Sequence, residues 1–133
     1  MLVRNCAGGV VFSGDKVLLV KGTEGEWLLP KGVIRSGDLS NEVVLRKVCD
    51  EVGIASEIIS TAGRTHYEIS SVSRVKPICN QITWYILKSQ NEQSDPSSAN
   101  TCFFDLEDAM NLVSSNQDRA ILNLSFKQFK QLA

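Results

Sequence analysis

The sequence has little histidine, and its cysteines are not arranged for metal binding. Among 133 residues there is one histidine, His66, and the 4 cysteines, Cys6, Cys49, Cys79 and Cys102, include no C-x-x-C pair. Because structural zinc sites use closely spaced sets of such ligands, a zinc site is not expected. The scattered thiols are typical of an intracellular protein whose cysteines are reduced and mostly buried.

The sequence also lacks an excess of one charge and a long apolar run. A formal net charge of -1 provides no general attraction to DNA or RNA, so nucleic-acid binding is not expected. No run is long enough to span a bilayer, and residues 1–12 do not have the layout of a signal peptide. A hydrophobic content of 43% with 22% charged residues indicates a globular protein. We therefore predict one cytoplasmic domain, residues 1–133, that is a monomer or a homodimer.

The first third of the chain has the pattern of strands and turns. Residues 4–12 and 16–22 are apolar, β-branched runs separated by Ser13-Gly14-Asp15, which predicts a hairpin. A third short run, 27–29, ends at Pro30, which cannot donate a ladder hydrogen bond. Glycine-punctuated residues 31–40 are then interpreted as a loop.

The pattern then changes to a helical period. The apolar residues between Glu42 and Val52 recur at spacings of three and four, which predicts an amphipathic helix with Ser40 as N-cap and Gly53 as its end.

The rest of the chain predicts further strands and two more helices. Residues 56–70 and 80–89 are interpreted as strands, and 102–113 as a strand end followed by a helix capped by Asp105. A closing helix over 116–132 places apolar residues at Ile121, Leu124, Phe129 and Leu132. These elements predict an α+β fold, an α/β/α sandwich with a mixed sheet between helices.

The charges on the first predicted helix allow an interpretation without any function. Glu42–Arg46, Arg46–Asp50 and Lys47–Glu51 are each four residues apart and of opposite sign, and such pairs are common on solvated helix faces. Taken alone, the predicted helix is best explained as a solvated face with paired charges. The residues before and after it favour a functional site instead.

The context is a long motif of fixed spacing. The chain resembles the Nudix family, whose box reads G-x5-E-x7-R-E-U-x-E-E-x-G-U, where U is a bulky aliphatic residue. The outright matches are Gly32, Arg46, Val48, Glu51, Gly53 and Ile54. Asp38 and Asp50 each replace one acid by another, and Lys47 reverses a charge. Segments "CAGGVVF", "WLLPKG" and "FFDLEDAMNLV" extend the resemblance over essentially the whole chain.

The resemblance implies the Nudix fold and hydrolysis of a nucleoside diphosphate linked to another group. Mg²⁺ or Mn²⁺ would neutralise the phosphates and acidify a bound water, and such hard ions prefer oxygen ligands. By resemblance, Glu51, Asp50 and Asp38 are the expected metal site, with Glu51 also catalytic. Arg46 is expected to orient a carboxylate, with Asp50 or Glu42 as its local partner.

Lys47 leaves two interpretations open, because family members usually have a glutamate there. It could pair with Glu51 and leave a weak or inactive domain that binds a nucleotide as a sensor or regulator. Alternatively, it could contact a substrate phosphate while a carboxylate elsewhere acts as the base. Glu92 is the main candidate, with Asp95 and Glu68 as others.

The loop "WLLPKG" with "IRSGD" is most similar to the branch that hydrolyses dinucleoside polyphosphates, although Arg35 replaces a usual glutamate. Arg35 in that loop is therefore expected at the substrate. Lys31 could face a substrate phosphate or be an ordinary surface lysine, and Gly32 could serve the turn, the approach of the backbone to a ligand, or both. Tyr67 could stack on a nucleobase or pack over the core, and Lys76 could meet a polyphosphate tail or remain solvated.

Overall fold

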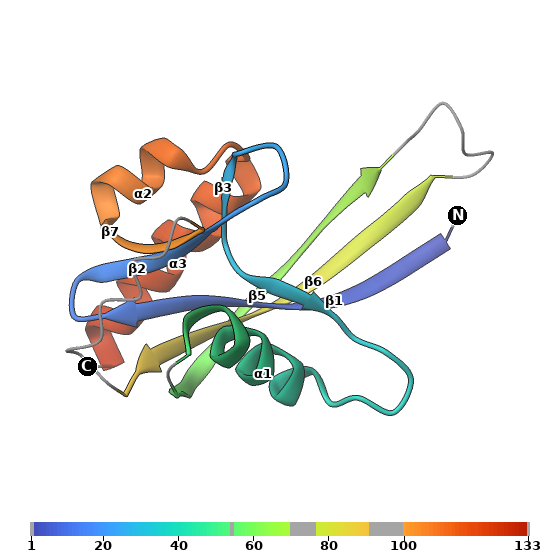
Figure 1. Ribbon diagram of the computed structural model, residues 1–133, viewed down its shortest axis with the longest axis horizontal. Helices are drawn as coiled ribbons and strands as arrows, with labels where there is room; N and C mark the ends of the chain where they lie inside the picture. The colour runs from blue at the N-terminus through green and yellow to red at the C-terminus, as the bar shows by residue number, and fades with distance from the viewer. Residues whose placement is uncertain (1, 54, 70–76, 91–99, 133) are drawn as a thin grey trace.

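A computed structural model describes residues 2–53, 55–69, 77–90 and 100–132 and shows a sheet between two helical layers (Figure 1). The strands are β1 (Leu2–Ser13), β2 (Lys16–Lys21), β3 (Trp27–Leu28), β4 (Lys31–Val33), β5 (Ser56–Ile69), β6 (Ile78–Ser89) and β7 (Thr101–Asp105). The helices are α1 (Ser40–Val52), α2 (Leu106–Leu112) and α3 (Asn116–Leu132).

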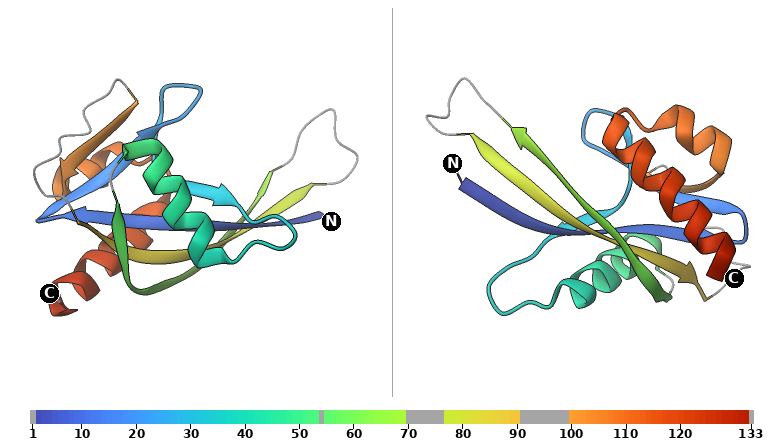
Figure 2. Two further views of the ribbon diagram at one scale, coloured as in Figure 1. Left: turned by 60° about the horizontal axis from the view of Figure 1, so that its bottom comes forward. Right: turned by 180° about the vertical axis from the view of Figure 1, so that it is seen from behind.

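The sheet is mixed, as the sequence predicts. Its strand order is β3-β2-β1-β6-β5, with β4 beside β1 and β7 beside β2. β1 and β6 run parallel, and the other pairs are antiparallel. Beyond the helical layers, β1, β6 and β5 continue together as a projecting arm that holds the N-terminal end of the described chain (Figures 1 and 2).

The predicted hairpin is confirmed, and the predicted loop after it is partly wrong. Ser13 pairs with Lys16 around a turn in which Gly14 has a φ of 60°. Lys31–Val33, however, is a strand, because its backbone pairs with β1 at Cys6–Gly8. Side chains alternate between the two faces along a strand. The pairing of β4 with β1 therefore sets which face of the sheet each of the side chains from Lys31 to Val33 lies on.

Helices cover both faces of the sheet (Figure 2). On one face, α1 packs through Val43, Val44 and Val48 on residues that include Ala7 and Val11 of β1. The other face carries a larger core, in which α2 and α3 cover alternate residues of the same strand: Cys6, Val10 and Phe12. This two-sided packing confirms the α+β sandwich.

Three predictions about the helices need correction. Leu39, and not Ser40, occupies the N-cap position of α1, and Ser40 is the first helical residue. Its hydroxyl is instead hydrogen-bonded to the Tyr85 hydroxyl of β6. Leu124 and Leu132 of α3 are 45% and 58% exposed. The face of α3 that packs on the sheet is instead the one with Ile121, Leu122, Ser125 and Phe129.

The other helix ends agree more closely with the sequence predictions. Gly53 ends α1 in the left-handed conformation, as predicted. Asp105 does precede α2, but its side chain makes no capping hydrogen bond. α3 begins after Ser115, whose hydroxyl accepts hydrogen bonds from the backbone N–H of Gln117 and Asp118.

The four cysteines are free thiols, and only part of the expectation about their burial is correct. Cys6 and Cys79 are buried, Cys102 is half-buried and Cys49 is exposed on α1. Burial raises the pKa of the Cys6 thiol, and the charges of Arg4 and Lys31 partly offset that effect. Within the described ranges, no helix is long and apolar enough to cross a membrane.

Candidate active site

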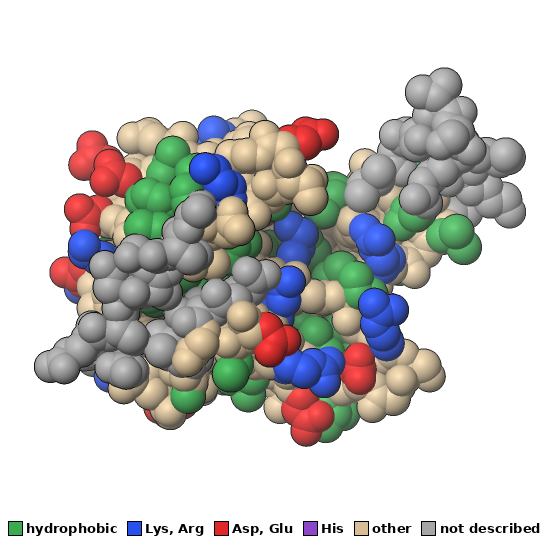
Figure 3. Space-filling model, in the orientation of Figure 1, with side chains coloured by type: hydrophobic (Ala, Val, Ile, Leu, Met, Phe, Trp, Pro, Cys, Tyr) green, Lys and Arg blue, Asp and Glu red, His purple; other side chains and the backbone are tan. Residues whose placement is uncertain are grey.

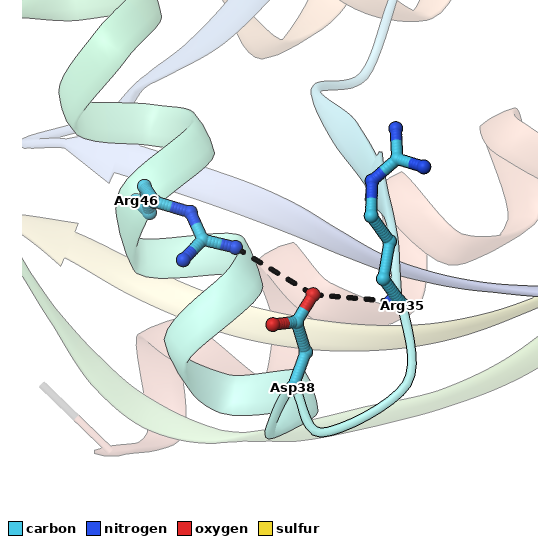
Figure 4. Close-up of polar contacts among 3 residues, drawn as sticks. All are labelled: Arg35, Asp38 and Arg46. Carbon is cyan, nitrogen blue, oxygen red and sulfur yellow. Dashed lines mark hydrogen bonds and ion pairs between the residues drawn. The ribbon is translucent and has the colours of Figure 1, made fainter.

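The loop before α1 is folded back on the helix by Asp38. The turn contains Gly37 at a φ of 88°, and the backbone N–H of Asp38 donates to the carbonyl oxygen of Arg35. In return, the backbone N–H of Arg35 donates to Oδ2 of Asp38 at 3.1 Å. The same Oδ2 lies 3.8 Å from the guanidinium of Arg46 on α1 (Figure 4). One carboxylate oxygen therefore joins the loop to the second turn of the helix.

This geometry corrects the expected partner of Arg46. In the part of the chain that the structure describes, the ion pair of Arg46 is with Asp38, and neither Asp50 nor Glu42 pairs with it. Arg46 and Asp38 are 60% and 27% exposed, so water screens the attraction. The side chain of Arg35 extends away from the carboxylate (Figure 4), and the residue is exposed.

Gly32 and Lys47 lie against each other where β4 passes α1. An added Cβ on Gly32 would lie 3.2 Å from Val43 and 3.7 Å from the Cβ of Lys47. An alanine here would therefore need the Val43 side chain to shift by a few tenths of an ångström, so a glycine fits this contact with the least crowding. Lys47 is half-buried at this contact and has a polar interaction, so it is not a freely solvated lysine.

The expected metal ligands are on α1 and the loop before it. Asp50 is exposed on α1, and Asp38 is half-buried on the loop. Glu51 is helical, but its side chain lies outside the described structure, so the Lys47–Glu51 pairing stays a prediction. Within the described residues, no three His, Cys, Asp or Glu side chains gather closely enough to hold a metal ion. The carboxylate oxygens of Asp38 and Asp50 are the donor type that Mg²⁺ and Mn²⁺ prefer, and Glu51 stays a predicted third ligand.

Lys31 lies on the opposite face of the sheet from α1. It pairs with Gly8, whereas its neighbour Gly32 pairs with Ala7. Ala7 packs in the α1 core, and a side chain at Gly8 would meet Trp84 of the other core. Since paired residues share a face, the Lys31 side chain is directed toward the α2 and α3 side.

The sequence analysis missed Asp118, which is a half-buried carboxylate on this second face. Burial raises the pKa of Asp118, and the positive charge of Lys31 acts in the opposite direction. A signal was present in the sequence, since Asp118 is one helical turn before Ile121 and so lies in the apolar stripe of the closing helix.

The remaining predicted substrate residues are less informative. Tyr67 is half-buried and packs against the larger core, which confirms the structural interpretation and leaves base stacking a prediction. Lys76, Glu92 and Asp95 lie outside the described residues.

Positive side chains are prominent on the face of the molecule that Figure 3 shows. Figure 3 shows Lys and Arg side chains around a depression in the middle of the face that carries α1. The net charge of the whole chain is -1, and the cations beside this depression are a local feature that suits a polyanionic ligand.

Solved structures share this fold over nearly the whole chain. The Ap4A hydrolase of Caenorhabditis elegans is 21% identical with a TM-score of 0.73, covering 97% of this chain and 99% of that protein. Dihydroneopterin triphosphate pyrophosphohydrolase of Escherichia coli is 19% identical with a TM-score of 0.73, covering 100% of both chains. An ADP-ribose pyrophosphatase of Streptococcus suis is 19% identical with a TM-score of 0.68, covering 96% of this chain and 92% of that one.

At these identities the structural neighbours define the class of fold, a mixed sheet between helices that this chain shares with them. The sequence model of the NUDIX domain matches residues 3–124. The chain therefore belongs to the Nudix family.

Proposed function

We propose that the protein is a metal-dependent hydrolase that cleaves a phosphoanhydride bond in a nucleoside diphosphate derivative. The observation that carries this proposal is the connection of the box loop to α1 through Asp38, which contacts both Arg35 and Arg46. The interpretation of α1 as a solvated helix with self-paired charges does not account for this contact. The Glu42–Arg46 and Arg46–Asp50 pairs that it predicts are not formed among the described residues.

Glu51, Asp50 and Asp38 would hold Mg²⁺ or Mn²⁺, with Glu51 as the main ligand. The ion would neutralise phosphate charge and acidify a bound water. Arg46 pairs with Asp38 and would hold it in place, and Gly32 allows β4 to approach α1 closely, so the β4 backbone would lie near the substrate phosphates. Arg35 and Lys76 would attract the phosphates, and Glu92 remains the candidate base.

A second candidate function is supported by Lys47. Its half-buried position beside Gly32 puts a cation where the family usually has a carboxylate. A lysine ammonium cannot ligate Mg²⁺, so the domain would bind a nucleotide as a sensor with little or no turnover. As a hydrolase, the protein would use Lys47 to contact a substrate phosphate.

Chromatographic detection of the hydrolysis products of dinucleoside polyphosphates, nucleotide sugars, nucleotide triphosphates and ADP-ribose, each with Mg²⁺ or Mn²⁺, separates these functions. Dinucleoside polyphosphates are the first substrates to test, because the "WLLPKG" loop resembles that branch. Glu51→Gln is expected to lower the turnover at least about 100-fold. The matched control is Glu42→Gln, an exposed glutamate of the same helix, which is expected to retain turnover.

Tight nucleotide binding without turnover on any of these compounds would support the sensor instead. Lys47→Glu distinguishes a suppressed site from an adapted one. A large rise in rate would show that Lys47 inhibits an otherwise intact site, and a fall would show that Lys47 assists the reaction.

A further inference from the structure

Lys47 places a positive charge beside the acids of the proposed metal site. It precedes Asp50 by three residues and Glu51 by four on α1. Positions at these spacings lie on one face of a helix. Two acids that would bind a metal ion are therefore next to a cation that belongs to the chain itself.

The position of Lys47 is restricted by its contact with β4. An added Cβ on Gly32 would lie 3.7 Å from the Cβ and 3.8 Å from the Cγ of Lys47, so the aliphatic stem lies along the β4 backbone. The residue is half-buried and has a polar interaction. A lysine whose stem is packed in this way is less free to turn into solvent than an exposed one. Its charge therefore stays near the place where β4 and α1 meet.

The two described acids of the proposed site differ in their partners. Asp38 uses Oδ2 for both the guanidinium of Arg46 and the backbone N–H of Arg35. Asp50 is exposed and, in the ranges that the structure describes, makes no hydrogen bond or ion pair. The Arg46 charge is thus used for Asp38, and the oxygens of Asp50 remain for an ion.

The formal charges of this region suit a single divalent ion. Its acids are Asp38, Asp50 and Glu51, and its cations are Arg46 and Lys47, so the acids exceed the cations by one. One Mg²⁺ or Mn²⁺ more than balances this excess and leaves positive charge for a phosphate. A second divalent ion would have to bind beside the Lys47 ammonium, and in a half-buried place water screens this repulsion poorly.

We propose that the Lys47 ammonium takes the place of a second divalent ion, so that the protein binds one Mg²⁺ or Mn²⁺ at Asp50 and Glu51 and contacts a substrate phosphate through Lys47. This inference rests on the proposed function for the location of the metal site. It goes beyond that function by fixing the number of ions. An ammonium donates hydrogen bonds to phosphate oxygens, which is the part of an ion's role that a lysine can supply.

The number of bound Mn²⁺ ions tests the proposal without requiring turnover. Equilibrium dialysis counts the ions per chain, and electron paramagnetic resonance shows whether two of them are close enough to be spin-coupled. Wild type is expected to bind one Mn²⁺, and Lys47→Glu is expected to bind two that are coupled, because two-metal sites hold their ions about 3.5 to 4 Å apart. Glu51→Gln is expected to weaken the wild-type ion at least about 10-fold, which shows that the count refers to this site.

The matched control is Lys127→Glu. It makes the same reversal of charge at an exposed lysine of α3 and is expected to leave the count at one.

Lys47→Met tests the charge without adding a metal ligand, and its apolar stem keeps the contact with Gly32. It is expected to bind one Mn²⁺ about 3- to 10-fold more tightly, because a like charge is removed. Binding of a methylene-bridged dinucleoside tetraphosphate, measured with Mg²⁺ by calorimetry, is expected to weaken about 10-fold, as for the loss of a charge-assisted hydrogen bond. This variant decides the question if Lys47→Glu does not fold in urea denaturation.

Three results would overturn the inference. They are two coupled Mn²⁺ ions in wild type, a single ion in folded Lys47→Glu, and unchanged affinities for Mn²⁺ and the analogue in Lys47→Met. Hydrolysis by a wild-type protein that binds two ions would refute only this inference. The expected ion counts without hydrolysis of any tested compound would refute the proposed function and leave the role of Lys47 standing.

Discussion

The two faces of the sheet carry different kinds of helical cover. On one face, α1 packs through three valines, and the Tyr85 hydroxyl is tied to Ser40. On the other face, α2 and α3 cover a larger core in which Phe12 stacks on Phe129 with ring centroids 4.5 Å apart. The α1 face carries most of the charged groups assigned to chemistry, and the α3 face carries most of the buried aromatic area. The larger packed core and most of the proposed active site therefore lie on opposite faces of one sheet.

The largest expected difference between the faces is in the stability that is lost when a core side chain is truncated to alanine. Phe129→Ala is expected to destabilise the protein by about 3 to 5 kcal/mol, because it removes a buried ring and leaves a cavity. Val44→Ala, on the α1 face, is expected to cost about 2 kcal/mol, because it removes only two methyl groups. Urea denaturation measures both, and equal losses would contradict the unequal contribution of the two faces.

Replacing either of two neighbouring glycines of β1 by alanine adds a methyl group to one of the two cores, and so compares how tightly the two faces are packed. A Cβ at Gly8 would lie 2.5 Å from the enclosed ring of Trp84, whereas one at Gly9 would lie 3.0 Å from the ends of Leu87 and Val44. Gly8→Ala is expected to cost about 3 kcal/mol and Gly9→Ala about 1 kcal/mol, since aliphatic side chains shift more readily than a packed indole. The reverse order in thermal or urea denaturation would show that the α1 face is the more rigid one.

Asp118 is the exception on the α3 face, and its effect on stability depends on pH. Because burial raises the pKa of its carboxyl in the folded protein, the native state binds more protons than the unfolded state just above the ordinary value of 3.8. The cost of the buried charge is therefore fully present above the folded pKa and disappears as the pH falls. Asp118→Asn is expected to stabilise the protein by about 1 kcal/mol at pH 7, with a smaller gain in acid.

Urea denaturation of wild type and Asp118→Asn at a series of pH values measures this gain. The control is Asp108→Asn on the exposed side of α2. A gain that does not change with pH, or a loss at neutral pH, would mean that the Asp118 charge is well compensated in the folded state.

The smallest effect is expected at the Arg46–Asp38 pair on the α1 face. A double-mutant cycle of Arg46→Ala and Asp38→Ala is expected to give a coupling energy below about 1 kcal/mol, because both side chains are partly exposed. The coupling should decrease further at high salt. A larger, salt-independent coupling would show that the pair stabilises the fold as well as the loop.

The local pattern of the sequence was sufficient for much of the fold. The hairpin around Gly14, the helix that ends at Gly53 and the sandwich of helices around a mixed sheet are all confirmed. These features depend on residues close in the chain, where period and turn chemistry are informative. The boundary errors at Ser40 and Lys31 arose because a hydroxyl in β6 and a backbone edge in β1 offered competing hydrogen bonds.

Contacts between distant segments could not be predicted in the same way. Arg46 has Asp50 four residues away in the sequence, but the fold of the loop places Asp38 nearer to its guanidinium. Leu124 and Leu132 fit an apolar stripe, but the crossing of α3 over the sheet selects the stripe of Ile121 and Phe129 instead.

What the sequence alone determined was membership of the Nudix family, because the spacing from Gly32 to Gly53 lies within one continuous stretch. Only the tertiary structure decided that Lys31 and Gly32, adjacent in the chain, serve opposite faces of the sheet. The alternation of a strand sends one toward Asp118 of α3 and leaves the other against Lys47 of α1. The faces of Lys31 and Gly32 could not be assigned from the sequence, because they depend on the register in which β4 pairs with β1.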